Sequence, residues 1–127
     1  MFSHVFVGSN DLEKSKHFYD AIFGALGYRS GVSVGDERYV YSNDKGFFAI
    51  TRPIDGQPAT SANGSTIGFY AKTQEAVDNW HAAGVENGGM SIEEPPGVRD
   101  TPFGAIYLAY LRDPDGNKLC AMYRVQA

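Results

Sequence analysis

The chain has 127 residues, of which 43% are hydrophobic and 20% are charged, and its formal net charge at pH 7 is −4. This length suits one domain, and the composition is typical of a folded globular chain rather than a disordered or fibrous one. The acidic balance argues against a nucleic-acid partner, which needs a surplus of Lys and Arg. One cysteine excludes an internal disulfide, and we expect neither a signal peptide nor a membrane span, which predicts a cytoplasmic protein.

The first half of the chain opens with an apolar run over residues 2–7, which predicts a strand that ends at a Gly-Ser-Asn turn. A helix is expected next, because Asn10 or Asp11 can cap it, apolar side chains recur on one face, and Gly27 offers a left-handed stop. Three β-rich runs separated by turn residues follow, over residues 28–34, 38–41 and 47–52.

The same order of elements then repeats. Residues 54–63 are rich in Gly, Pro, Ser, Ala and Asn and are predicted to be a linker. Beyond them come a strand, a helix capped by Thr73, and three further strands over residues 90–94, 105–111 and 118–124. We therefore divide the single domain into module one (1–53), the linker and module two (64–127).

An alignment of the two halves pairs residues that are expected to be equivalent. Laying residues 2–9 over residues 64–71 places His4 against Thr66. Aligning Gly46 with Gly116, each at the end of a polar turn, places Ile50 against Cys120. The evidence for this repeat is the order of the elements and the residues of the turns, rather than sequence identity between the halves.

Several motifs occur in one order along the chain, namely His4 in the first strand, Asn10 to Ser15 followed by Phe18-Tyr19, Leu26-Gly27-Tyr28, and the closing Asp113-Pro114-Asp115-Gly116-Asn117-Lys118. Together they resemble the vicinal oxygen chelate superfamily, which includes glyoxalases, bleomycin-resistance proteins and extradiol dioxygenases. The resemblance covers the whole chain. It implies an α+β fold in which two βαβββ modules form an open eight-stranded barrel-like sheet, with the helices outside and a cavity within.

Strand alternation predicts which side chains face that cavity. If His4 points inward, Phe2 and Phe6 do too, whereas Val5 and Val7 lie under the helix. The same rule places Ile50 inside, and in the family the connection that carries Arg99 approaches the cavity mouth. The expected ligand-binding residues are His4, Phe6, Phe48, Arg52, Thr66, Tyr70, Arg99, Tyr107, Cys120 and Met122. The alternative is that the aromatic side chains simply fill the barrel.

The resemblance also implies a divalent metal ion, held by one inward residue from the first and last strand of each module. The matching positions are His4, Ile50, Thr66 and Cys120. His4 is the only ordinary ligand, and Cys120 is a possible zinc ligand that lacks partners. We therefore expect a degenerate metal site and no bound cofactor. Tyr41, Tyr70 or Tyr107 remain as possible oxygen donors.

The reactive side chains each have a structural interpretation as well as a functional one. Cys120 is either a buried inert thiol or, if it faces His4, one half of a reactive pair. His4 alone is a rim or buried histidine. Asp113 and Asp115 are expected to cap backbone amides.

Two classes of function remain open. The first is a metal-free protein that binds a small organic molecule in an aromatic cavity, as bleomycin-resistance proteins do. The second is a divalent-metal-dependent lyase or isomerase of the lactoylglutathione lyase type, which is the expected class if the chain is an enzyme. A third possibility is an oligomeric member whose cavity is closed. The resemblance further implies a homodimer, because pairing would cover exposed sheet edges.

Overall fold

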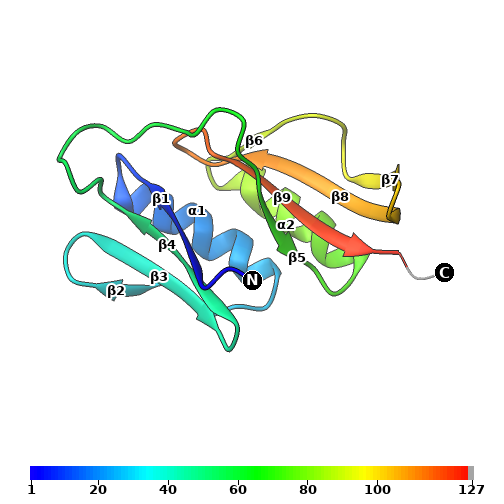
Figure 1. The fold of residues 1–127 in the computed structure, drawn as a ribbon, viewed down its shortest axis with the longest axis horizontal. Coiled ribbons are helices and arrows are strands. Elements are labelled where there is room, and N and C mark those ends of the chain that lie inside the picture. Colours follow the sequence, from blue (N-terminus) through cyan, green and yellow to red (C-terminus); the bar gives the residue numbers. More distant parts are fainter. Residues whose placement is uncertain (126–127) are drawn as a thin grey trace.

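The computed structural model describes residues 1–125 and divides them between two modules of like topology (Figure 1). Module one forms a four-stranded sheet of order β1-β4-β3-β2, in which β1 and β4 run parallel and the other pairs are antiparallel. Its elements are β1 (His4–Gly8), α1 (Leu12–Ala25), β2 (Val32–Val34), β3 (Arg38–Asn43) and β4 (Gly46–Thr51).

Module two repeats this path as β5-β9-β8-β6, again with one parallel pair between its first and last strands. Its elements are β5 (Ile67–Tyr70), α2 (Gln74–Glu86), β6 (Met90–Ser91), β7 (Gly97–Thr101), β8 (Gly104–Arg112) and β9 (Lys118–Arg124). The predicted α+β architecture of two repeated modules is confirmed, and the two open sheets lie side by side.

The sheets of residues 1–125 hold nine strands where eight were expected, because one edge strand of module two is interrupted. β6 and β7 both pair with β8, β6 at its carboxyl end and β7 at its amino end. Between them Glu93 adopts a left-handed φ of 58°, and Pro95 and Pro96 lack the N–H that a ladder needs. β6 and β7 together therefore occupy the position that β2 has in module one.

Both helices cover the same side of the two sheets, α1 behind β1 and β4, and α2 behind β8 and β9 (Figure 1). Asp11, not Asn10, caps α1 by accepting from the backbone N–H of Lys14, and Thr73 caps α2 in the same way. The core lies between helices and sheets and includes Trp80. In the part of the chain that the structure describes, the opposite faces of both sheets carry no helix. No helix within residues 1–125 is long and apolar enough to cross a membrane.

The turn between β8 and β9 ties module two to module one. The Asp113 carboxylate accepts from backbone N–H groups of its own turn, as predicted, and also from the Tyr19 hydroxyl on α1 at 2.6 Å. The Asp115 carboxylate accepts from Asn10 and from the Ser15 hydroxyl. Burial raises the pKa of Asp113 despite these hydrogen bonds, which act in the opposite direction. We call this set of contacts the inter-module latch.

Candidate functional site

A pocket of about 340 Å³ opens at the seam between the modules, where the start of β1, the β3–β4 turn and β5 meet. We call it the seam pocket. Its lining is dominated by aromatic rings, namely Phe2, Phe23, Tyr28, Tyr41, Phe47, Phe48, Phe69 and Tyr70. Phe69 contributes to the floor from module two and packs edge-on against Phe23 and Phe48 of module one. The pocket is thus built by both modules of one chain.

His4 stands at the rim of the seam pocket. Its ring stacks on Phe47, with centroids 4.8 Å apart and planes 6° from parallel, and its Nδ1 lies 2.7 Å from the Ser3 hydroxyl. Val7, by contrast, is buried beneath α1. The faces predicted for β1 are therefore confirmed, and His4 is the rim histidine of the structural interpretation.

The faces predicted for β4 are wrong by one residue. Because His4 pairs with Phe47, Phe48 lies beside Val5 on the helix-covered face. Ile50 is 0% exposed and Phe48 is 6% exposed, so Ile50 belongs to the core and Phe48 reaches the seam pocket only from its floor. The side chain that shares the open face with His4 is that of Phe47.

The cause is a difference in turn length between the modules. Four residues separate the paired Ser42 and Phe47, whereas five separate the paired Arg112 and Lys118. An alignment on the turn glycines therefore slips by one position, and a slip of one turns a strand over. The open-face residue of β4 that corresponds to Cys120 is Ala49 rather than Ile50.

In module two the faces predicted for β5 and β9 are correct. Gly68 pairs with Cys120 and Tyr70 with Met122, all on the face without a helix, while Leu119 and Ala121 are fully buried. Thr66 is exposed just before β5. Burial raises the pKa of the Cys120 thiol, which disfavours the thiolate that a nucleophile or metal ligand requires.

Phe6, Thr66, Cys120 and Met122 are not among the residues that line the seam pocket, and three further predicted site residues also lie outside it. Arg52 is exposed beyond β4 and borders a separate polar groove beside the start of α1. Arg99 donates to the carbonyls of Glu94, Pro95 and Gly97, so its guanidinium holds its own connection in shape. The Tyr107 hydroxyl donates to Asp78 of α2 and therefore points to the helix side.

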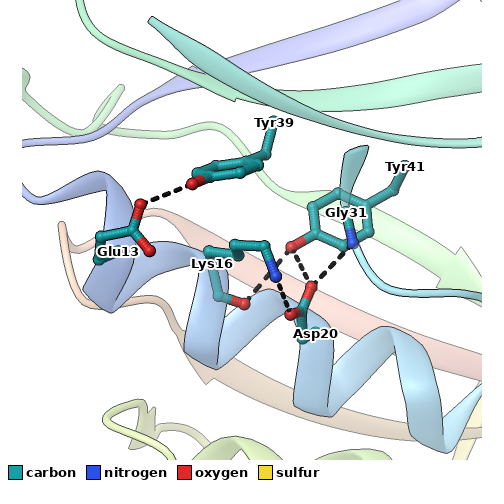
Figure 2. A network of polar contacts seen from close by, with 6 residues as sticks. All are labelled: Glu13, Lys16, Asp20, Gly31, Tyr39 and Tyr41. Atoms are coloured by element: carbon teal, nitrogen blue, oxygen red, sulfur yellow. Dashed lines mark hydrogen bonds and ion pairs between the residues drawn. The ribbon is translucent and has the colours of Figure 1, made fainter. Parts of the chain in front are cut away.

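Tyr39 and Tyr41 also turn their hydroxyls toward α1, where they donate to Glu13 and Asp20 (Figure 2). Asp20 accepts as well from Lys16 and from the Gly31 N–H. Burial by itself would raise the pKa of Asp20, but these hydrogen bonds outweigh it and lower the pKa. Burial and the Asp20 carboxylate raise the pKa of Tyr41 far above its usual range. Of the three tyrosines considered as possible oxygen donors, Tyr41 and Tyr70 line the seam pocket and Tyr107 does not.

Sequence reasoning did not select Phe47, Phe69 or Lys45, all of which line the seam pocket. Phe47 and Phe69 were missed for different reasons. The one-residue slip in the alignment of β4 placed Phe47 on the wrong face of its strand. Phe69 lies on the helix side of β5, and it lines a pocket only because module one packs against module two there. The pairing of β4 with β1 could have identified Phe47. The face predicted for His4 is correct, and the residue of β4 that pairs with His4 lies on the same face.

The donor set does not fit the divalent ion that the fold family implies. Within residues 1–125, no three His, Cys, Asp or Glu side chains gather closely enough to hold a metal ion. Because Ala49 rather than Ile50 is equivalent to Cys120, the four positions that would hold the ion are His4, Ala49, Thr66 and Cys120. Ala49 has no donor atom, and a neutral Thr hydroxyl does not replace a charged ligand. No chemical step through a metal follows from this arrangement.

Comparisons with known proteins agree with this fold. A family model described as the Glyoxalase/Bleomycin resistance protein/Dioxygenase superfamily matches residues 1–121. A glyoxalase/bleomycin resistance protein from Albidiferax ferrireducens T118 is 60% identical, with a TM-score of 0.95 over 98% of this chain and 99% of that one. No curated protein matches the chain.

More distant structures share the fold alone. A glyoxalase/bleomycin resistance protein/dioxygenase family enzyme from Burkholderia phytofirmans PsJN is 20% identical, with a TM-score of 0.74 over 97% of this chain and 98% of that one. A lactoylglutathione lyase from Agrobacterium tumefaciens is 18% identical, with a TM-score of 0.65 over 96% of this chain and 92% of that one.

Proposed function

The chain belongs to the glyoxalase/bleomycin resistance protein/dioxygenase superfamily, and from this membership we propose that it binds a small organic molecule in the seam pocket without the family's divalent metal ion. The observation that carries the proposal is the aromatic lining of the seam pocket, which both modules supply. Concave sites lined by apolar and aromatic groups with a few polar points are the usual form of small-molecule sites.

The geometry of the rim favours a flat ligand body. Phe47 is 36% exposed and Tyr70 is 70% exposed, so both present ring surface to a ligand rather than to the core. Aromatic side chains gain from offset stacking or edge contacts with another ring, beyond the area that they bury. A pocket filled by its own side chains would have left these rings covered.

A metal-dependent lyase activity has less support than metal-free binding. That chemistry needs an ion to polarise a carbonyl and a general base beside it. Of the four compared positions, only His4 is an ordinary ligand, and the Cys120 thiol has a raised pKa. The similarity to a lactoylglutathione lyase, at 18% identity, supports the fold and adds nothing for the reaction.

We also propose that a second copy of the chain covers the helix-free faces of the two sheets. These faces expose Phe6 and Tyr70, a surface that a soluble protein normally covers. Family membership favours a homodimer. A partner on these faces would roof the seam pocket and exclude water from its aromatic walls.

The proposed function is tested with 2-naphthamide, a neutral two-ring probe, by isothermal titration calorimetry in buffer that contains EDTA. We expect binding that the chelator leaves unchanged. Phe47→Leu should weaken it about fivefold, since it removes one aromatic contact. Phe103→Leu, at the exposed tip of the β7–β8 hairpin outside the pocket, is the matched control and should bind as the wild type does.

Two results would count against the proposal. Equal binding by the wild type and Phe47→Leu would place the ligand elsewhere. Near-stoichiometric nickel, zinc, iron or manganese in protein purified without chelators would contradict the proposal that the protein works without a metal ion.

A further inference from the structure

The charged and polar groups at the rim of the seam pocket restrict the class of ligand. We infer, on the basis of the proposed function, that the ligand is an aromatic anion, with a planar ring in the pocket and a carboxylate or phenolate held at the β3–β4 turn. This names a chemical class for the bound molecule.

Lys45 carries the only fixed charge among the described residues that line the seam pocket, and no Asp or Glu belongs to that lining. The neighbouring Asp44 lies outside the lining, although it shares the turn. An anionic ligand in the seam pocket would therefore lie near one lysine and near no carboxylate of the pocket lining. Because the whole chain has a net charge of −4, this positive edge is a local feature.

The turn also presents a second donor beside Lys45. The Asn43 amide oxygen accepts from the backbone N–H groups of Lys45 and Gly46, at 2.8 and 3.1 Å. The oxygen is thereby used inside the turn, which leaves the amide nitrogen, a donor, for a ligand. Acceptor groups on the ligand are favoured at this edge, and charge-assisted hydrogen bonds to an anion are the stronger kind.

The aromatic surface lies next to these donors. Phe47 follows Lys45 by two residues, and the stacked pair of Phe47 and His4 forms the wall that rises from the turn. A ring that packs against this wall brings a substituent at its edge toward Lys45 and Asn43. The imidazole of His4 adds a further polar group on the same side.

The test compares 2-naphthoate with 2-naphthamide and 2-naphthylmethylammonium, three probes that share a ring system and differ in charge, by isothermal titration calorimetry. We expect the wild type to bind 2-naphthoate about three- to tenfold more tightly than 2-naphthamide, the range for a partly exposed charge-assisted contact. This preference should shrink as salt is raised. Lys45→Gln should abolish the preference, because it should weaken the binding of 2-naphthoate more than that of 2-naphthamide.

Lys14→Gln removes the same charge from the exposed side of α1, outside the pocket, and should preserve the preference. Equal binding of the carboxylate and the amide, tighter binding of the ammonium probe, or equal effects of the two lysine variants would overturn the anion assignment and leave the proposed function standing. If the wild type binds none of the three probes, both proposals fall.

Discussion

At the scale of single residues, several carboxylates of this chain hold neighbouring structural elements together through hydrogen bonds. Asp20 accepts from Lys16, Tyr41 and the Gly31 N–H, and so joins α1 to β3 and to the segment before β2 (Figure 2). Its lowered pKa means that the folded state favours the ionised form. The stability that this provides is present above the unfolded-state pKa, about 4, and is lost as pH falls through the folded-state pKa.

Asp20→Asn should therefore lower the free energy of unfolding by about 1 kcal/mol at pH 7, a modest value because the carboxylate is partly exposed. The difference from the wild type should be smaller at pH 3 than at pH 7. Urea unfolding at both pH values measures it, with Asp100→Asn, an exposed carboxylate on β7, as the control. A difference that grows on acidification would contradict the assignment.

At the scale of elements, the approach of β1 to β4 depends on a glycine. A Cβ built on Gly46 would lie 2.5 Å from the backbone carbonyl oxygen of Ser3, which accepts from the Phe47 N–H. Backbone cannot move aside as the end of a flexible side chain can. The absence of a side chain at this position lets β1 start against β4 and so sets the wall that His4 and Phe47 form.

Gly46→Ala should cost about 2 kcal/mol of stability, as overpacking at a close contact does. Gly24→Ala is the opposite control, because a Cβ at this exposed helical position meets nothing within 4 Å. It should stabilise the protein by up to about 1 kcal/mol through helix propensity. Thermal unfolding of both variants checks this, and shifts of Tm in the same direction would refute it.

Local signals predicted the elements well, and contacts between elements limited the prediction of the site. The cap at Thr73, the choice of Asn10 or Asp11 as the other cap, and the faces of β1 and β9 follow from chemistry within a few residues of each position. The face of β4 depends on one extra residue in a distant turn, which an alignment of turn glycines conceals. Tyr107 was predicted to face the cavity, but its hydroxyl donates to Asp78 on α2. A contact between a strand and a helix cannot be deduced from the alternation of residues within the strand.

At the scale of the whole molecule, the helix-free sheet faces are the surfaces that we propose a second copy covers. We expect a mass in solution of twice the 13.8 kDa of one chain. Phe6→Glu places a charge on the helix-free face of module one and should shift the protein toward monomer, because an unpaired charge in an apolar interface is costly. Val85→Glu on α2 is the matched control and should leave the mass unchanged. Light scattering after size-exclusion chromatography makes both measurements.

A monomeric wild type at tens of micromolar would contradict the homodimer. The same measurement bears on the seam pocket, since the proposed partner roofs it. Loss of the dimer in Phe6→Glu should therefore be accompanied by weaker probe binding.

The inter-module latch has one more consequence. Asp113 and Asp115 on one module hold Tyr19, Asn10 and Ser15 on the other, and an aromatic contact between Phe69 and Phe23 lies at the seam. Each half thus carries groups that recognise its counterpart, and the connector between β4 and β5 joins the same contacts, because the Ala59 backbone exchanges two hydrogen bonds with the Asn10 side chain. Because these contacts do not depend on an unbroken backbone, we expect a chain severed at one peptide bond of that connector to persist as a two-piece protein.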